Sequence, residues 1–301
     1  MKVFLTGGTG VVGTRALPAL VAAGHDVTAV ARTDAKAALV DRLGGRSVHV
    51  DLFDQEAVAA AVVGHEAVVN LATSIPPMSQ AARPSAWAGN ERLRIEASAH
   101  LVDAALAAGA GRVIQESITY PYVDCGDRWI DEDVECTHVG AFAGAATAEA
   151  ATSRFAHQGG SGVVLRFGAF YAPDSSHLQA FNKLARWRVN PFIGDPEGFA
   201  SFIHAGDAGD AVVAALRAPS GTYNVVDDRP LSRTEAGEAV ADALGVGRVH
   251  AVPKAVLALM PSAAKALDRS QRVSNRRFKE ASGWSPAHPS ISGAWPGRSG
   301  W

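Results

Sequence analysis

The fold of this chain is decided by the stretch Thr6-Gly7-Gly8-Thr9-Gly10-Val11-Val12-Gly13. It follows an apolar, strand-like run at residues 3–6 and opens a helical segment over residues 10–23, whose apolar side chains recur on one face. The glycines satisfy G-x-G-x-x-G. Between a strand and a helix, such glycines allow a tight turn, the close approach of a pyrophosphate and its capture at the helix N-terminus. The stretch therefore predicts a dinucleotide-binding site; the alternative is a strand-to-helix turn without a ligand.

Short apolar runs alternate with longer helical stretches from residue 1 to about residue 165. That rhythm predicts right-handed βαβ units in one parallel sheet. We therefore expect an α/β fold, a Rossmann-type doubly wound parallel sheet, with residues 1–165 as the NAD(P)-binding domain. Residues 166–301 are expected to form a smaller, mainly substrate-binding region, of which about 200–230 returns to the Rossmann core. The expected strands cover residues 3–6, 27–31, 47–50, 67–71, 112–115, 162–165 and 222–226, and the expected later helices cover residues 208–217 and 233–244. The last fifteen residues, rich in Pro, Gly and Ser, are expected to be a loosely held tail.

Composition limits the environment and the partners. The 301 residues carry 28 Lys and Arg against 30 Asp and Glu, which gives no field that would attract nucleic acid or an anionic membrane. Cys125 and Cys136 lack a CxxC or His-rich neighbourhood, so neither a disulfide framework nor a metal site is expected. The N-terminal apolar run is too short for a signal-peptide core, and apolar residues nowhere run far enough to span a bilayer. We expect a cytoplasmic protein whose partner is a small-molecule substrate.

The end of the second strand indicates which dinucleotide binds. In NAD-preferring sites an acidic residue there holds the ribose 2′-hydroxyl. Ala31 and Arg32 stand at that position instead, and a guanidinium favours a 2′-phosphate through a charge-assisted contact. We expect NADP(H) as the cofactor, with NAD(H) as second choice; the alternative is that Arg32 is a solvated loop cation. Asp51 and Leu52, after the third strand, are expected to meet the adenine ring, although a capping aspartate would look the same.

Further landmarks resemble those of the extended short-chain dehydrogenase/reductase family, which includes sugar-nucleotide epimerases and dehydratases. After the glycine stretch come Asp51-Leu52 and then Asn70-Leu71-Ala72 at the end of the fourth strand. The stretches at residues 115–119, 166–173, 202–207 and 283–286 resemble the family's serine-bearing strand end and its R-P-x-x-x-Y-G-P, F-I-H-V-x-D and L-G-W-x-P motifs. The resemblance covers nearly the whole chain. It implies a Rossmann fold and an NAD(P) cofactor that Leu71 and Ala72 help to hold.

The resemblance fails at the residues that move protons. The family uses a Ser or Thr together with Tyr-x-x-x-Lys on a helix, where the lysine lowers the pKa of the phenol. No Tyr-x-x-x-Lys occurs in this chain. Counting back from Glu149, which resembles a glutamate of the family pattern, the tyrosine position falls at Ala141 and the lysine position at Ala145. Arg94 stands where the family commonly has Asn, so the usual proton relay is missing.

The remaining catalytic candidates are Ser117, Thr119 and Tyr122. The first two are expected to hydrogen-bond the substrate oxygen. Tyr122, without a lysine beside it, is expected to stay protonated and to donate a hydrogen bond. The predicted activity is an NADP(H)-dependent reductase or epimerase-type reaction on a small carbonyl, sugar-like or secondary-metabolite substrate. The alternatives are a non-redox isomerase, cyclase or lyase that reuses the pocket, and a catalytically silent NADP(H) sensor.

Three other features carry further expectations. His138 is a candidate proton carrier or an exposed loop histidine, and His204 is expected to make a structural hydrogen bond. The basic residues either hold a substrate phosphate or form a solvated face; they are Arg269, Arg272, Arg276, Arg277 and Lys279. The small side chains of residues 140–152 predict close helix packing and a two-fold homodimer, with packing on the protein's own sheet as the alternative.

Overall fold

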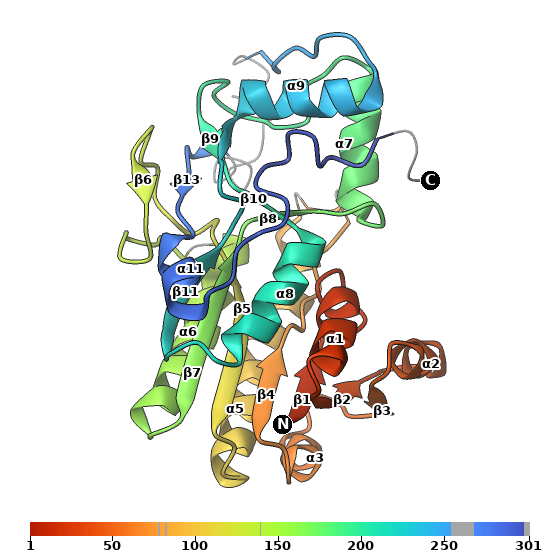
Figure 1. Cartoon of the computed structure of the whole chain (residues 1–301), viewed down its shortest axis with the longest axis vertical. Helices are drawn as coiled ribbons and strands as arrows, with labels where there is room; N and C mark the ends of the chain where they lie inside the picture. The colour runs from red at the N-terminus through yellow and green to blue at the C-terminus, as the bar shows by residue number, and fades with distance from the viewer. Residues whose placement is uncertain (78, 82, 139, 254–267, 298–301) are drawn as a thin grey trace.

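A seven-stranded parallel sheet forms the centre of the molecule (Figure 1). The computed structural model describes all residues except 78, 82, 139, 254–267 and 298–301. The strand order is β11-β7-β5-β4-β1-β2-β3, so the order reverses beside β1, where ligands bind in open α/β sheets. This confirms the expected Rossmann-type doubly wound sheet. The strands of this sheet are β1 (Lys2–Thr6), β2 (Asp26–Val30), β3 (Arg46–Val48), β4 (Ala67–Asn70), β5 (Arg112–Ile118), β7 (Ser161–Phe167) and β11 (Gly221–Val225).

Helices cover both faces of the sheet, because its strands are buried on both sides (Figure 1). The apolar side chains of α1 and α8 pack in one core with Leu5, Val69 and Leu165. Those of α3 and α5 pack on the opposite face with Phe4, Val68 and Val113. The helices up to α6, together with α8, are α1 (Gly13–Ala22), α2 (Asp34–Arg42), α3 (Gln55–Val62), η1 (Pro84–Trp87), α4 (Ala88–Arg92), the π-helix η2 (Leu93–Ala97), α5 (Ser98–Ala107), η3 (Gly140–Phe142), α6 (Ala143–His157) and α8 (Ala205–Ala215).

Local sequence explains where two of the helices begin. The first helix starts at Gly13 and not at Gly10 as expected, because residues 10–12 complete the turn, in which the Gly10 N–H donates to the Gly7 carbonyl. The expected helix at residues 233–244 is confirmed as α9 (Arg233–Leu244). It begins with a capping box between Ser232 and Glu235. It ends at Gly245, whose φ of 62° is left-handed.

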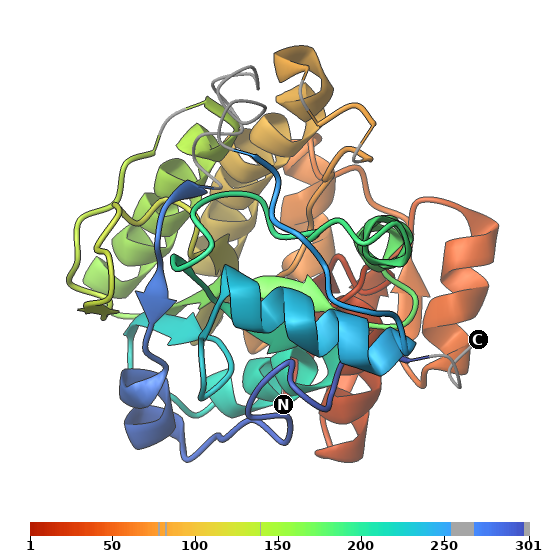
Figure 2. The ribbon, with the colours of Figure 1, turned by 90° about the horizontal axis from the view of Figure 1, so that it is seen from above.

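A smaller C-terminal lobe lies over the carboxyl ends of the strands, with α9 crossing above the sheet (Figure 2). The chain does not stay in this lobe, because β11 returns to the sheet and pairs with β7. The other elements after α6 are β8 (Ala169–Tyr171), α7 (Ser176–Arg186), β9 (Phe199–Ala200), β10 (Phe202–His204), β12 (Leu231–Ser232), β13 (Arg272–Val273), which pairs with β6 (Trp129–Ile130), and α11 (Arg276–Ser282).

The expectation of a loose C-terminal tail is wrong for the residues before 298. Trp295 is only 5% exposed. Its ring stacks on Tyr171, and its indole N–H donates to Asn182. Ile291 is buried beside it in the core that α7 and α9 form. Aromatic burial therefore holds this segment against the lobe despite its Pro, Gly and Ser content.

No described helix is both long enough and apolar enough to cross a membrane.

Candidate active site

The glycine stretch forms a turn with no room for side chains. A Cβ on Gly7, which has φ of 70°, would lie 2.3 Å from the Leu71 carbonyl oxygen, and a Cβ on Gly13 would lie 2.1 Å from the Gly7 oxygen. Helix α1 then begins without a side-chain cap at Val12 and without an acidic residue in its first turn. The N–H groups of residues 11–13, for which the described residues supply no backbone acceptor, and the positive end of the helix dipole are therefore left for an anion. The turn fits the pyrophosphate of a dinucleotide.

The other predicted cofactor residues lie at the carboxyl ends of the neighbouring strands. Arg32 follows β2, is exposed, and makes no hydrogen bond or ion pair to another described residue. Asp51 follows β3 and accepts from the Phe53 N–H, so it makes a local turn. The Leu52 carbonyl contacts His100, and Leu71 and Ala72 follow β4. The structure brings these residues to the edge at which β1 presents the glycines.

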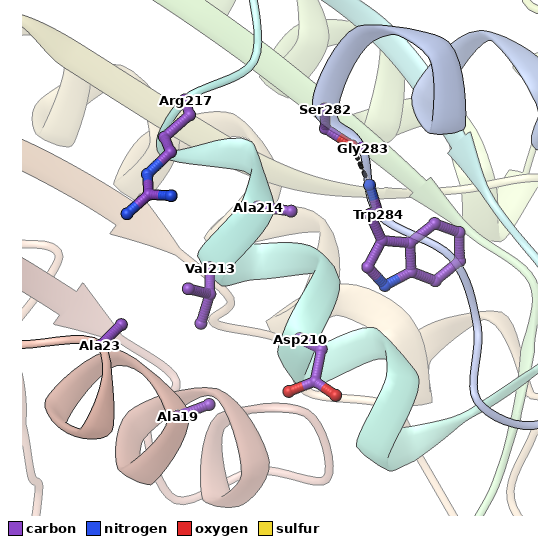
Figure 3. Close-up of a pocket in the computed structure, with 9 residues that line it drawn as sticks. All are labelled: Ala19, Ala23, Asp210, Val213, Ala214, Arg217, Ser282, Gly283 and Trp284. Carbon is purple, nitrogen blue, oxygen red and sulfur yellow. Dashed lines mark hydrogen bonds between the residues drawn. The ribbon is translucent and has the colours of Figure 1, made fainter.

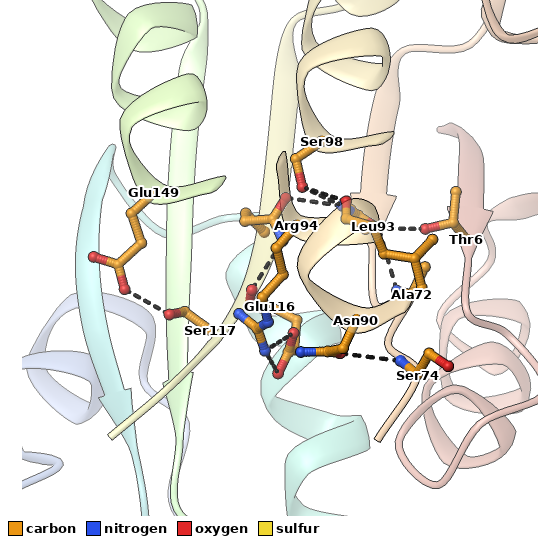
Figure 4. Close-up of polar contacts among 12 residues, drawn as sticks. Thr6, Ala72, Ser74, Asn90, Leu93, Arg94, Ser98, Glu116, Ser117 and Glu149 are labelled. Atoms are coloured by element: carbon orange, nitrogen blue, oxygen red, sulfur yellow. Dashed lines mark hydrogen bonds and ion pairs between the residues drawn. The ribbon is translucent and has the colours of Figure 1, made fainter. Parts of the chain in front are cut away.

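A buried polar network ties the ends of β1, β4 and β5 together (Figure 4). Asn70 accepts from the Thr6 hydroxyl, and its amide donates to Gln115 and to Ser98 of α5. The Asn70 oxygen also accepts from the Ala72 N–H. This network fixes the backbone at the carboxyl ends of these three strands.

The hydroxyl groups of Ser117 and Tyr122 both belong to a second network. Ser117 is fully buried and donates to Glu149 over 2.5 Å. Glu149 also binds Arg166 through both carboxylate oxygens. Arg166 donates to the Tyr122 hydroxyl, which in turn donates to Asn224. These bonds connect α6, β7 and β11 behind the end of β5.

This geometry does not support the role predicted for Tyr122. The hydroxyl is buried, and its proton is directed to Asn224. Burial also raises the pKa of Tyr122 above its usual range, so the phenol stays protonated. The Ser117 proton is likewise directed to Glu149, not toward a substrate oxygen. Thr119 is anchored by a bond from its N–H to the Phe167 carbonyl, while its hydroxyl makes no hydrogen bond to a described residue.

The region around the empty tyrosine and lysine positions is apolar and aromatic. Ala145 is fully buried in α6. Phe142, one residue after Ala141, stacks on Tyr120 with ring centroids 5.7 Å apart and meets Trp87 edge-on. Among the four tyrosines, only the hydroxyl of Tyr120 forms no hydrogen bond with a described residue. No other described tyrosine hydroxyl is therefore free to replace the missing phenol.

A buried ion pair, which the sequence analysis did not single out, lies beside these positions (Figure 4). Arg94 Nη2 donates to both carboxylate oxygens of Glu116 at 3.0 and 2.9 Å, and the Arg94 side chain is 2% exposed. Burial raises the pKa of the Glu116 carboxyl, and the guanidinium acts in the opposite direction. Two features of the sequence could have indicated this pair. Glu116 lies near the end of the apolar strand β5, and Arg94 stands where the family commonly has Asn.

The basic residues of the C-terminal part already have partners. Arg269 donates to the carbonyl groups of residues 120–122, and Arg272 lies over the Trp129 and Phe199 rings. Arg277 pairs with Asp133 and Glu132. Arg276 pairs with Glu280, and Lys279 pairs with Asp228. The interpretation as a substrate-phosphate site has no support in this geometry.

His204 and His288 make hydrogen bonds within the protein, whereas His138 has a ring nitrogen without a partner among the described residues. His204 accepts from the Gly206 N–H and caps α8, which confirms the expected structural bond. His204 lies beside Asp207 and His288, but the Asp207 carboxylate is already filled by the N–H groups of residues 287 and 288 and by the His288 ring. His138 is half-buried, its Nε2 has no partner among the described residues, and burial lowers its pKa.

A separate hollow of about 340 Å³ lies between α1, α8 and the segment after α11 (Figure 3). Ala19, Asp210 and Trp284 line it. Ala19 belongs to the half of α1 that is remote from the glycine turn. The hollow is therefore not part of the candidate active site.

The fold and the glycine turn together define a dinucleotide-binding α/β protein of the Rossmann type. Residues 3–226 match the model of the NAD-dependent epimerase/dehydratase family. A 3-diazoavenalumate denitrifying reductase from Streptomyces sp. is 33% identical over 302 residues, which cover 96% of this chain and 97% of the relative. The chain belongs to the NAD-dependent epimerase/dehydratase family. It is an enzyme of the NAD(P)-dependent oxidoreductase or epimerase type.

Solved structures agree with this fold. A human epimerase family protein with NADPH superposes with a TM-score of 0.78 at 24% identity, covering 98% of this chain and 97% of that protein. The Thermus thermophilus UDP-glucose 4-epimerase in complex with NAD superposes with a TM-score of 0.77 at 21% identity, covering 97% and 96%.

Proposed function

We propose that this protein is an NADPH-dependent reductase of a small electrophilic molecule, and that it works without a positioned acid/base dyad. The observation that carries this proposal is the combination of an intact glycine cradle with the lack of Tyr-x-x-x-Lys. Bound NADPH would supply a hydride at the nicotinamide. The residues of the chain would then bind and orient the substrate.

The choice of NADPH rests on the surroundings of Arg32. β2 is followed by Ala31, which is buried and carries no carboxylate for a ribose 2′-hydroxyl. Arg32 is exposed and uncommitted directly before the N-terminus of α2, where Thr33 caps the helix. A 2′-phosphate placed there would meet the Arg32 guanidinium.

The missing dyad favours a reaction in which hydride transfer is not coupled to proton donation by a phenol. The relative's name describes reductive removal of nitrogen from a diazo compound. When an arenediazonium ion accepts a hydride at the carbon that bears nitrogen, one C–H bond forms, the C–N bond breaks and dinitrogen leaves. That balance requires no proton. A carbonyl group would instead need a proton from water or from a weak donor such as Thr119.

Thr119 and Ser117 have different roles in the proposed reaction. The Thr119 hydroxyl stays available for a hydrogen bond to the substrate. Ser117 becomes a positioning residue, because it holds Glu149 and thereby the start of the network that reaches Arg166.

Anaerobic incubation with NADPH deuterated at the transferable position tests the function. The panel contains aryl ketones, a UDP-sugar and an arenediazonium salt. We expect NADPH oxidation with the diazonium salt or a ketone, and deuterium on the carbon that is reduced. Conversion of a substrate without oxidation of NADPH would favour the non-redox isomerase, cyclase or lyase. Tight binding of NADPH without any conversion would favour the sensor.

A further inference from the structure

We propose that Arg94 binds an anionic oxygen of the substrate, and that the substrate is a planar aromatic anion. This inference rests on the proposed function, since it places the substrate beside the nicotinamide. It assigns a ligand to the Arg94 guanidinium, which has two buried nitrogens without a hydrogen-bond partner among the described residues.

The first argument is the unequal use of the Arg94 nitrogens. Only Nη2 contacts Glu116, whereas Nε and Nη1 are buried and have no partner among the described residues. A buried N–H without an acceptor is costly and rare. Arginine stays protonated, so these groups can bind an oxygen anion but cannot release a proton to it.

The second argument is the place of Arg94 in the fold. It belongs to the π-helix η2, and such irregular helical turns are common at functional sites. Gly144 of α6 lies against the base of the Arg94 side chain, because a Cβ on Gly144 would be 3.0 Å from the Arg94 Cβ. It would also be 3.0 Å from Glu91 Oε2, which accepts from the Gly144 N–H. Ala145, the empty lysine position, is the next residue. The Arg94 side chain therefore begins beside the part of α6 from which the family's lysine is missing, and it extends from there to Glu116.

The third argument is a group of aromatic rings in segments that are close in sequence to those of Arg94, Glu116 and Gly144. Trp87 belongs to η1, Tyr120 lies two residues beyond β5 and Phe142 belongs to η3. The rings contact one another and remain half-buried. Half-buried aromatic faces favour a flat aromatic ligand.

Because Glu116 pairs with Arg94, a variant that tests the Arg94 site must also account for the Glu116 carboxylate. Removing Arg94 alone would leave a buried carboxylate without its partner, which destabilises a protein by itself. The double variant Arg94→Met with Glu116→Gln removes both charges at once. Glu116→Gln alone keeps the guanidinium and frees it from its carboxylate. The matched control is Arg92→Ala, which removes an exposed arginine of the preceding helix that pairs with Glu96.

The measurement is calorimetric binding of cinnamate and of the neutral cinnamamide, with and without saturating NADP⁺. NADP⁺ affinity is measured separately for every variant. We expect the wild type and Arg92→Ala to bind cinnamate more tightly than cinnamamide. Glu116→Gln should bind cinnamate at least as tightly as the wild type. The double variant should bind cinnamate about 10- to 100-fold more weakly, as expected for a lost charge-assisted hydrogen bond, and NADP⁺ within about two-fold of the wild type.

Three results would overturn the assignment. Equal binding of cinnamate and cinnamamide by the wild type would show that no anion is recognised. Unchanged cinnamate binding by a folded double variant would mean that the free donors are satisfied by water only. Loss of NADP⁺ affinity by the same factor as cinnamate would assign the donors to the cofactor. If the double variant does not fold, Glu116→Gln alone still tests the proposal, because cinnamate binding weaker than that of the wild type would count against it. Failure of NADP⁺ to bind the wild type would instead refute the proposed function.

Discussion

Replacing Gly13 by alanine tests the glycine cradle most directly. A Cβ at this position would lie 2.1 Å from the Gly7 oxygen and 2.6 Å from the Gly8 Cα, whereas ordinary contacts of a Cβ begin at 3.4 Å. The obstacles are backbone atoms, so the turn itself must open by more than 1 Å. Overpacking of this kind typically costs about 1–3 kcal/mol. If the turn relieves this strain by moving the backbone that binds the pyrophosphate, NADPH affinity should fall by about 10- to 100-fold.

The control must lose stability without disturbing the site. Gly24 has φ of 85° and open space around its Cβ position, so Gly24→Ala strains the backbone beyond the far end of α1 by about 1–2 kcal/mol. Urea unfolding gives the stability of both variants, and calorimetric titration gives their NADPH affinity. We expect both variants to be destabilised and only Gly13→Ala to lose affinity. A Gly13→Ala variant that binds NADPH within two-fold of the wild type would refute the assignment of this turn to the pyrophosphate.

Four further outcomes are expected. Arg32→Ala should weaken NADPH binding by about 1–3 kcal/mol and leave NADH binding unchanged. If calorimetry gives equal affinities of the wild type for both cofactors, Arg32 does not bind the 2′-phosphate. Tyr122→Phe should lower the free energy of unfolding by about 1–3 kcal/mol, because Arg166 and Asn224 lose a buried partner; a lost turnover rate in the folded variant would restore Tyr122 as a catalytic residue. Burial raises the pKa of Asp227 to about 8, above that of an unfolded aspartate, so its contribution to stability is full at low pH and is lost as the pH rises through about 8. The slope of unfolding free energy against pH between about 4 and 8 should therefore become less negative in Asp227→Asn, and an unchanged slope in urea titrations contradicts this. Finally, we propose a two-fold homodimer through exposed small residues of α6 such as Ala143, Thr147 and Ala150. Light scattering at micromolar concentration should give twice the chain mass, and a monomer would count against the dimer.

The local features of the fold could be predicted from the sequence because short-range rules govern them. The glycine stretch after β1 requires a turn that excludes every side chain, and the alternation of apolar runs with helical segments leaves few arrangements other than a parallel sheet. The capping box at the start of α9 is likewise a local pattern, since Ser232 and Glu235 are three residues apart. The tail was misjudged because its composition is polar on average, whereas two buried side chains, Ile291 and Trp295, hold it.

The candidate site was predictable only in part, because hydrogen-bond partners depend on segments far apart in the chain. The sequence by itself determined the cofactor edge and the lack of a Tyr-x-x-x-Lys pair. Only the tertiary structure decided that Tyr122 meets Asn224, 102 positions away, and so turns from a candidate donor into a structural residue. It also decided that Arg94 meets Glu116 inside the protein and keeps two nitrogens free. A motif can state which groups are present, but burial and the partners that folding brings together decide which of their protons and charges remain available to a ligand.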